Sequence, residues 1–294
     1  WIFKQLYEDG YAKYIDMPVN WCEELGTVLS NDEVIDGKSE RGGYPVVRKN
    51  MKQLCIDQVA FAEKLLEGLN HIDWPESTKE MQRNWIGRST GVEVEFEIVG
   101  GGKFSIFTTC IETIYGITFM VLAPDGQLVQ DLMPRIKNQD EVKAYIQETL
   151  SKSDMDRTEL NKGKTGCRLE GIKAINPVNG REVEVFIGDF VLANYGTGAV
   201  MAVPSHDQRD FEYAKAHNID MIQVIEGRDV SECAFEKQDY LGKGCKLINS
   251  EEFTGLTVEE AKVAITKKLV AMGIAKEKVN YRFREWIFAR QRYW

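Results

Sequence analysis

The chain has 294 residues, of which 43% are hydrophobic and 28% are charged, as is typical of a globular protein with a sizeable core. Its 37 basic and 46 acidic residues give a net charge of −9, which argues against non-specific nucleic-acid binding but not against recognition of a nucleic-acid end in a shaped pocket. No apolar run approaches the roughly 18 residues of a membrane helix, and the start at Trp1 does not resemble a signal peptide. We therefore expect a cytoplasmic piece of a longer protein, with one or two domains and no membrane contact.

The first 86 residues predict a small module of helices and loops. Residues 1–16 have aromatic and leucine side chains at helical spacing, and residues 57–69 predict an amphipathic helix packed on a core. Between them, residues 18–50 are rich in glycine and predict mainly loops with short strands.

Beyond Trp85 the pattern changes to short strands. Hydrophobic residues alternate with glutamates over residues 92–98, which predicts a half-buried strand, and the glycines at 100–102 turn the chain into a partner strand. A buried strand is predicted at residues 119–122 and a helix at residues 140–150. The residues expected to face inward from this helix are Val142, Tyr145, Ile146 and Leu150.

The second half of the chain continues this pattern. Asn179-Gly180 is a hairpin signal that leads into apolar residues over 183–192, and residues 199–203 predict another strand. Residues 257–260 form a capping box that opens a helix. Many short strands with few helices favour a closed or nearly closed β-barrel between about residues 88 and 280.

Tryptophan is confined to the two ends of the chain, since residues 86–285 contain none. This distribution predicts one domain inserted into another, so that both ends belong to the same host domain. The tryptophans are Trp1, Trp21, Trp74, Trp85, Trp286 and Trp294.

Six cysteines are spread along the chain without a C-x-x-C pair, which supports neither a zinc site nor a disulfide framework. A reducing cytoplasm is the simplest compartment for such a chain, and we expect no metal and no cofactor. The cysteines are Cys22, Cys55, Cys110, Cys167, Cys233 and Cys245.

The segment most informative about chemistry covers residues 194–210 and reads NYGTGAVMAVPSHDQRD. Two glycines flank Thr197, so the backbone there can approach a ligand closely. Asp207 or Ser205 can cap the helix that follows, and Asp210 falls in its first turn, where free backbone N–H groups favour carboxylates. From the residues alone, these aspartates either only cap the helix or also bind a ligand.

The adjacent Ser205, His206 and Asp207 do not predict a nucleophilic triad, because that geometry normally requires separate elements. We interpret His206 instead as a polar wall of a pocket. His71 and His217 are interpreted as surface or packing residues.

A second segment, residues 107–116, reads FTTCIETIYG and clusters Thr108, Thr109 and Thr113 near the end of a predicted strand. Such threonines can bond their own backbone. They can equally line a pocket whose hydroxyl and methyl groups measure an aliphatic side chain. The segment alone is compatible with both interpretations.

Together the two segments resemble the editing domain, connective polypeptide 1, of leucyl-tRNA synthetase, a class I aminoacyl-tRNA synthetase. Residues 196–210 are similar to one editing signature of that family, and the threonine-rich segment to the other. Residues 84–89 look like the start of the insertion and residues 284–294 like the return to the synthetic domain. Residues 19–22 and 34–37 are similar to a small module that binds zinc in some relatives.

The resemblance implies an α+β fold. Residues 87–282 would form a β-barrel editing domain with peripheral helices, flanked by residues 1–86, a host module with a degenerate zinc-module-like segment, and by residues 283–294, which return toward the synthetic domain. Only Cys22 remains of that module's usual cysteines, so no metal is expected. Cys110-Ile111 replace the family's usual Arg-Pro, which removes a cation near the tRNA end. The motifs His-x-Gly-His and Lys-Met-Ser-Lys-Ser are absent, so we do not expect the chain to form leucyl-adenylate.

The resemblance further implies post-transfer editing, in which the ester that links isoleucine, norvaline or methionine to the terminal adenosine of leucine tRNA is hydrolysed. The implied partners are the aminoacylated 3′ end of that tRNA and the remainder of the synthetase. Asp210, helped by Asp207, would hold the α-ammonium group, and Thr108, Thr109 and the backbone near Tyr195 would position the attacking water. The implied binding residues are Thr108, Thr109 and Tyr195 for the adenosine, Met201 and His206 as pocket walls, Thr113 to crowd leucine, and the aspartates Asp207 and Asp210.

Two other functions stay open at this point. One is a non-catalytic module that binds the tRNA end and has a degenerate site at Cys110-Ile111. The other is a β-barrel that binds a small nucleotide. Hydrolysis of isoleucyl-tRNA separates the first from an enzyme, and titration with AMP against an aminoacyl-adenosine analogue tests the second.

Overall fold

The structure is a computed structural model in which none of the described helices is long and apolar enough to cross a membrane. The residues it describes are 1–150, 157, 165–193 and 196–287.

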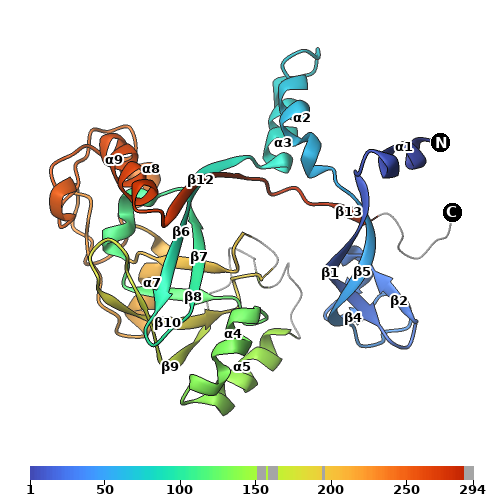
Figure 1. Cartoon of the computed structure of the whole chain (residues 1–294), viewed down its shortest axis with the longest axis horizontal. Coiled ribbons are helices and arrows are strands. Elements are labelled where there is room, and N and C mark those ends of the chain that lie inside the picture. The colour runs from blue at the N-terminus through green and yellow to red at the C-terminus, as the bar shows by residue number, and fades with distance from the viewer. Residues whose placement is uncertain (151–156, 158–164, 194–195, 288–294) are drawn as a thin grey trace. The chain divides into compact units, whose positions relative to one another are not determined.

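The described chain divides into two compact units (Figure 1). The first contains Trp1–Thr90, Leu150 and the chain from Val279 onward. The second contains Gly91–Thr149 and the described residues from there to Lys278. The two ends of the chain therefore belong to one unit, and the segment between them forms the other.

The first unit is built on an antiparallel sheet with the strand order β13-β5-β1-β2. Its two long strands pair from Ala12 opposite Ile56 to Trp21 opposite Val47. A small hairpin and a 3-10 turn lie between β2 and β5. The elements are β1 (Ala12–Cys22), β2 (Thr27–Leu29), η1 (Asn31–Glu33), β3 (Val34–Ile35), β4 (Lys38–Ser39), β5 (Val47–Ile56) and β13 (Trp286–Ile287).

One prediction for this unit is wrong. The helix expected over residues 1–16 is limited to α1 (Ile2–Glu8), whereas residues 18–50 contain the predicted loops and short strands together with the end of β1 and the start of β5. The chain turns at Gly10, whose φ is +80°, and Ala12 already pairs with β5. Helical spacing is a local signal, and the pairing with a distant strand overrides it.

The helices of this unit follow the sheet. The helix predicted over residues 57–69 is present as η2 (Val59–Phe61) continued by α2 (Ala62–Gly68). Next comes α3 (Glu76–Ile86), which ends at Gly87. The φ of Gly87 is +59°, the left-handed conformation that glycine adopts readily at the end of a helix.

The second unit contains a mixed sheet with the order β11-β8-β10-β9-β6-β12, and β7 pairs with β6 outside this path. β10 is parallel to β8, whereas β9 with β10, β11 with β8, and β7 with β6 are antiparallel. The predicted strands over 92–98, 119–122 and 199–203 are therefore confirmed as parts of one sheet. The strands are β6 (Ser89–Ile98), β7 (Lys103–Thr108), β8 (Phe119–Leu122), β9 (Gly166–Ile175), β10 (Glu182–Gly188), β11 (Ala199–Ala202) and β12 (Ala275–Asn280).

The predicted closed barrel is not confirmed, although the mixture of strands and helices is. β7 and β11 lie close together in space, but in the described part of the chain no hydrogen-bonded ladder joins them. β11 has only four residues, which pair with β8, and β7 leaves the sheet at Thr108. Alternation along a strand shows which residues are buried but not whether two edge strands pair.

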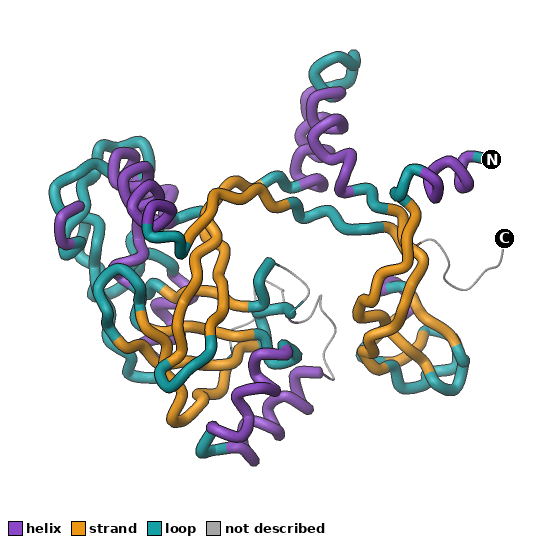
Figure 2. Tube along the Cα trace, in the orientation of Figure 1, coloured by secondary structure: helices purple, strands orange, loops and turns teal. Residues whose placement is uncertain are grey.

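Helices and 3-10 turns surround this sheet, shown in purple beside the orange strands in Figure 2. Thr257 and Glu260 form the predicted capping box of α9, because each side chain accepts a hydrogen bond from the backbone N–H of the other residue. α5 buries Val142 and Ile146 as expected, but Leu150 at its end is 37% exposed, contrary to the prediction. The elements are η3 (Ile111–Gly116), α4 (Gln127–Leu132), η4 (Met133–Arg135), α5 (Gln139–Leu150), α7 (Gln208–Ala216), α8 (Lys237–Tyr240), η5 (Glu251–Phe253) and α9 (Val258–Ala271).

A small aromatic cluster fixes α7 against the sheet. Tyr213 on α7 lies 5.3 Å from the Phe119 ring and 5.6 Å from the Phe186 ring, between ring centroids. Phe119 begins β8 and Phe186 lies on β10, so two adjacent strands hold the helix. Large buried aromatic side chains contribute strongly to packing. The cluster therefore sets the position of the start of α7, where the two aspartates of interest lie.

Candidate active site

The glycine-rich part of the first segment leads into β11. Gly196 and Gly198 both have a φ of +69°, a conformation that favours glycine. The carbonyl oxygen of Gly198 accepts a 2.8 Å hydrogen bond from the N–H of Ala123, which follows β8. Met201 on β11 is partly exposed and packs on the main core. Tyr195, predicted to contact the adenosine, lies outside the described residues.

The turn after β11 brings two carboxylates together. Oδ1 of Asp207 accepts hydrogen bonds from the N–H groups of Arg209 at 2.9 Å and Asp210 at 3.1 Å, so Asp207 is the N-cap of α7. Oδ2 of Asp210 accepts a 3.0 Å hydrogen bond from the N–H of Val203, the residue after β11. Capping is thus confirmed for Asp207, whereas Asp210 ties the helix start back to the end of the strand.

The exposure of these carboxylates differs. Asp207 is partly exposed, and its Oδ2 lies 3.8 Å from the guanidinium group of Arg209. Asp210 is only 7% exposed. A negative charge at the start of a helix is stabilised by the free N–H groups and the helix dipole. The turn therefore holds two carboxylates at one fixed position at the edge of the sheet.

His206 is bonded at both ring nitrogens. Nδ1 lies 3.0 Å from the carbonyl oxygen of Phe235, and Nε2 accepts from the N–H groups of Val224 at 3.0 Å and Ile225 at 3.3 Å. This pattern requires a neutral ring with the proton on Nδ1. Burial lowers the pKa of His206 to about 4. Since neither nitrogen reaches Ser205 or Asp207, the structure agrees with the exclusion of a triad, and any contact of His206 with a ligand is a packing contact.

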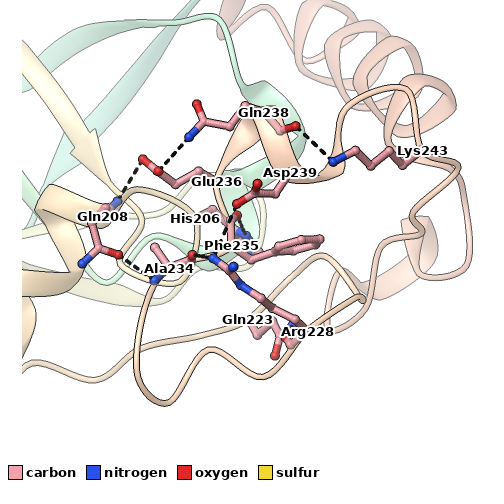
Figure 3. A network of polar contacts seen from close by, with 10 residues as sticks. All are labelled: His206, Gln208, Gln223, Arg228, Ala234, Phe235, Glu236, Gln238, Asp239 and Lys243. Carbon is pink, nitrogen blue, oxygen red and sulfur yellow. Dashed lines mark hydrogen bonds and ion pairs between the residues drawn. The ribbon is translucent and has the colours of Figure 1, made fainter.

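A network of polar contacts fastens the chain around Phe235 to this turn (Figure 3). The side-chain oxygen of Gln208 accepts a 3.0 Å hydrogen bond from the N–H of Ala234, and the N–H of Phe235 donates to the carbonyl oxygen of Ser205 at 2.8 Å. Arg228 donates to the carbonyl oxygen of Ala234. His206 and Gln208 therefore organise the loop that covers the turn.

The threonine-rich segment follows β7. The hydroxyl of Thr108 accepts a 3.0 Å hydrogen bond from the N–H of Cys110, and the hydroxyl of Thr113 donates to the carbonyl oxygen of Cys110 at 2.9 Å. These two threonines thus bond their own backbone, as one of the interpretations expected. Thr113 is only 2% exposed, whereas Thr109 is partly exposed, with its hydroxyl 3.6 Å from the Cys110 sulfur.

The two segments meet where η3 leads into β8. The N–H of Thr118 donates to the carbonyl oxygen of Ala202 at 3.3 Å. Gly116 packs so closely that a Cβ there would lie 3.0 Å from Cγ1 of Val203. The fold therefore places the threonine-rich segment beside the turn with the two carboxylates, although about 90 residues separate them in the sequence.

Comparison with known proteins gives the family. Residues 83–270 match the model of the leucyl-tRNA synthetase editing domain, a range that includes both segments. The chain belongs to this family. Among solved structures it is similar to the crystal structure of the ternary complex of Agrobacterium radiobacter K84 agnB2 LeuRS with tRNA and LeuAMS. The TM-score is 0.75 at 30% sequence identity, and the match covers 100% of this chain and 33% of that chain.

The structure adds three residues to the candidate site that the sequence interpretation missed. Glu112 on η3 is fully buried, and its Oε1 accepts a 3.4 Å hydrogen bond from the hydroxyl of Tyr240. The Tyr240 ring lies 5.9 Å from the imidazole of His206, which links η3 to the carboxylate turn. Lys262 on α9 donates from Nζ to the carbonyl oxygen of Thr109 at 2.8 Å. Glu112 belongs to the segment that the sequence singled out, but no sequence pattern near Tyr240 or Lys262 indicates that these residues contact it.

The electrostatics of Glu112 are governed by burial. Desolvation raises the pKa of Glu112, while a backbone hydrogen bond and the charges of Lys262 and Lys237 act in the opposite direction. Its Oε2 is buried without a hydrogen-bond partner. The threonine-rich segment therefore contains a buried carboxyl group, that of Glu112, whose neutral form is favoured by burial.

The described residues contain no group of three potential metal ligands. Cys22, the residue that matches the zinc module, is fully buried at the end of β1, with its sulfur 3.9 Å from a carboxylate oxygen of Glu24.

Proposed function

We propose that this chain hydrolyses the ester between a mischarged amino acid and the terminal adenosine of leucine tRNA. Three observations support the proposal. The chain belongs to the editing-domain family of leucyl-tRNA synthetase, its structure resembles a LeuRS–tRNA complex, and two hydrogen-bonded carboxylates lie beside the threonine-rich segment. The position of the two carboxylates beside the threonine-rich segment carries the proposal. The carboxylates can bind the amino-acid end of an aminoacyl ester, and the threonines can bind its adenosine end.

Such a step is needed because a binding pocket discriminates between similar amino acids by only a small free energy. One methylene group in an apolar pocket discriminates by only about 1–3 kcal/mol, a limit for which aminoacyl-tRNA synthetases are themselves the standard example. Isoleucine, norvaline and methionine are close to leucine in size and polarity. A second site that admits these amino acids and excludes leucine can hydrolyse the mischarged tRNA and leave leucyl-tRNA intact. We propose this role in the cytoplasm, as part of a longer synthetase.

In the proposed mechanism, Asp210 binds the α-ammonium group of the substrate and Asp207 adds a second negative charge. Charge-assisted hydrogen bonds are stronger than neutral ones, and Asp207 reaches the surface. The two fixed carboxylates orient the ester relative to the attacking water. The gain comes from positioning and from stabilisation of the developing oxyanion.

The threonines act on the other side of the ester. Thr108, Thr109 and Tyr195 hold the terminal adenosine, and Thr109 positions the water. Water attacks the carbonyl carbon, the bond to the ribose oxygen breaks, and that oxygen leaves as a hydroxyl group with the proton that water loses. We assign water activation to the free hydroxyl of the terminal ribose, because both nitrogens of His206 are occupied.

The amino-acid side chain is selected by three residues in this proposal. Thr113 crowds the γ-branched leucine, while Met201 and His206 form walls. The hydrogen bond from Thr113 to Cys110 fixes the rotamer of Thr113 and hence the position of its methyl group. A stiff β-branched residue can clash with one branching pattern and tolerate others.

The test is hydrolysis of leucine tRNA charged with isoleucine, measured as release of free isoleucine. We expect release by the 294-residue chain above the spontaneous rate. Binding of the same tRNA without release would instead identify a non-catalytic module for the tRNA end. Preference for AMP over a non-hydrolysable aminoacyl-adenosine analogue would identify a nucleotide-binding protein.

A further inference from the structure

A lysine from a distant helix reaches the backbone of the threonine-rich segment. α9 packs on η3, and Nζ of Lys262 donates a 2.8 Å hydrogen bond to the carbonyl oxygen of Thr109. Lys262 lies 153 positions beyond Thr109 in the sequence, and it is partly buried. Hydrogen bonds from a charged donor are shorter and stronger than those between neutral groups.

The surroundings of Lys262 favour a cation at this position. Among residues 108–113, Glu112 is the only charged side chain, and it is fully buried. The positive charge of Lys262 acts on this carboxyl group as well as on the Thr109 carbonyl oxygen. Lys237 is a second cation near Glu112, and the hydroxyl of Tyr240 donates a hydrogen bond to the carboxyl group of Glu112. Lys262 is thus placed to hold the segment through the carbonyl oxygen of Thr109.

We propose that Lys262 is a positioning residue for the deacylation, in that it fixes the carbonyl group of Thr109 and thereby the hydroxyl group that positions the attacking water. This inference rests on the proposed function. At the other end of the segment, the carbonyl oxygen of Ile114 accepts a 2.9 Å hydrogen bond from the side chain of Asn176, while Thr108, Cys110 and Thr113 bond one another. Lys262 is therefore the contact that fastens the Thr109 end of the segment to α9. It acts through Thr109 and does not touch the substrate.

The test compares Lys262→Met with Lys262→Arg in single-turnover deacylation of isoleucyl-tRNA, with the protein in excess and varied in concentration. We expect Lys262→Met to lower the maximal rate by about tenfold and to leave the half-saturating concentration within twofold, because the tRNA contacts remain. Arginine can also donate to a carbonyl oxygen, so Lys262→Arg should recover most of the rate.

Lys267 on the same helix provides a matched control. Its side chain is exposed, and Lys267→Met removes the same charge from α9. We expect this variant to keep the wild-type rate. Thermal unfolding of all variants, followed by circular dichroism, establishes that the rates are measured on folded protein. If Lys262→Met does not fold, Lys262→Gln replaces it: this shorter, uncharged side chain should also lower the maximal rate, and an unchanged rate would overturn the inference.

The outcomes separate this inference from the proposed function. Absence of isoleucine release by the wild-type chain overturns the proposed function and the inference with it. Release by wild type together with an unchanged rate for folded Lys262→Met overturns the inference alone. A change confined to the half-saturating concentration, or an equal loss for Lys267→Met, also overturns it, since either would indicate an effect on tRNA binding.

Discussion

The two parts of the proposed site are held in different ways. In the carboxylate turn, residues 203–210, the two carboxylates bond the turn itself, because Asp207 caps α7 and Asp210 bonds Val203, while the neighbouring His206 and Gln208 bond residues 224–235. The threonine-rich segment, residues 107–116, also bonds its own backbone but depends in addition on Tyr240 and Lys262 from distant elements. The two carboxylates are therefore positioned by local bonds, whereas the threonine-rich segment depends on bonds from distant elements. Substitutions should affect them differently.

The largest expected effect is at Thr113, in the threonine-rich segment. Thr113→Tyr should block hydrolysis of every aminoacyl-tRNA by filling the space beside the ester, whereas Thr113→Ala should allow hydrolysis of correctly charged leucyl-tRNA. Thr113→Val is the matched control, since it keeps the β-branched shape and loses only the hydrogen bond to Cys110. It should continue to spare leucyl-tRNA. Deacylation of leucyl-tRNA and isoleucyl-tRNA by the folded variants measures these effects.

The Thr113 prediction has a clear contrary result. If Thr113→Ala still spares leucyl-tRNA while it hydrolyses isoleucyl-tRNA, leucine is excluded elsewhere. Met201 and Cys110-Ile111 are then the next residues to test. Because Thr113 is buried, circular dichroism must show that the tyrosine variant is folded before its inactivity counts.

In the carboxylate turn, Asp210→Ala should lower deacylation by about tenfold to a hundredfold, the equivalent of about 1.5–3 kcal/mol for a charge-assisted contact. Asp210→Asn sharpens the test, because its amide oxygen can still accept from the N–H of Val203 while the charge is lost. The asparagine variant should fold like wild type and still lose at least tenfold. Full activity of Asp210→Asn would reduce Asp210 to a structural role in the turn.

These two regions also show what could be predicted from the sequence. The Thr257 capping box and the alternating strand at 92–98 were predicted correctly because each depends on residues close in sequence. Asp207 as a cap of α7 belongs to the same class. The closed or nearly closed barrel is not confirmed, because a hydrogen-bonded ladder between β7 and β11 depends on the path of the whole sheet.

For the site, residue types and the family resemblance identified both segments, and the fold places them together. They did not identify Tyr240 or Lys262, which contact the threonine-rich segment from 128 and 153 positions away. The helix predicted over residues 1–16 failed for a similar reason, since β5 recruits its second half into a strand. Contacts between distant residues are what a single sequence leaves undetermined.

A third effect is a loss of folding stability at acidic pH, which we expect from His206 in the carboxylate turn. His206 is held neutral, with a pKa of about 4, whereas an unfolded histidine has a pKa near 6.5. Between these values the unfolded chain binds a proton that the native chain does not, so the free energy of unfolding should fall as the pH decreases from about 6.5 toward 4. The full loss is about 3 kcal/mol.

Urea unfolding at pH 7, 5.5 and 4.5 measures this effect, and His206→Gln is its control. Glutamine has a donor and an acceptor but does not titrate, so its unfolding free energy should depend less on pH in this range. Equal pH dependence of the two proteins would show that other groups cause the acid sensitivity.

The smallest effect is expected at Glu112 and has the opposite sign. Burial raises the pKa of Glu112, so the native chain holds a proton that the unfolded chain loses as the pH rises through the ordinary range of glutamate. The contribution of this group to stability should therefore decrease with increasing pH. Glu112→Gln keeps a neutral side chain of the same shape and should be slightly more stable than wild type at pH 7. A lower urea midpoint for this variant would show that the ionised carboxylate, paired with the nearby lysines, is the native form.

The central claim is selective hydrolysis, and a competition in one reaction tests it most directly. Leucine tRNA charged with labelled leucine is mixed with the same tRNA charged with differently labelled isoleucine, and the 294-residue chain is added. We predict that free isoleucine appears well above the spontaneous rate while leucine stays attached. Equal release of both amino acids, or release of neither while the tRNA is bound, would contradict the account.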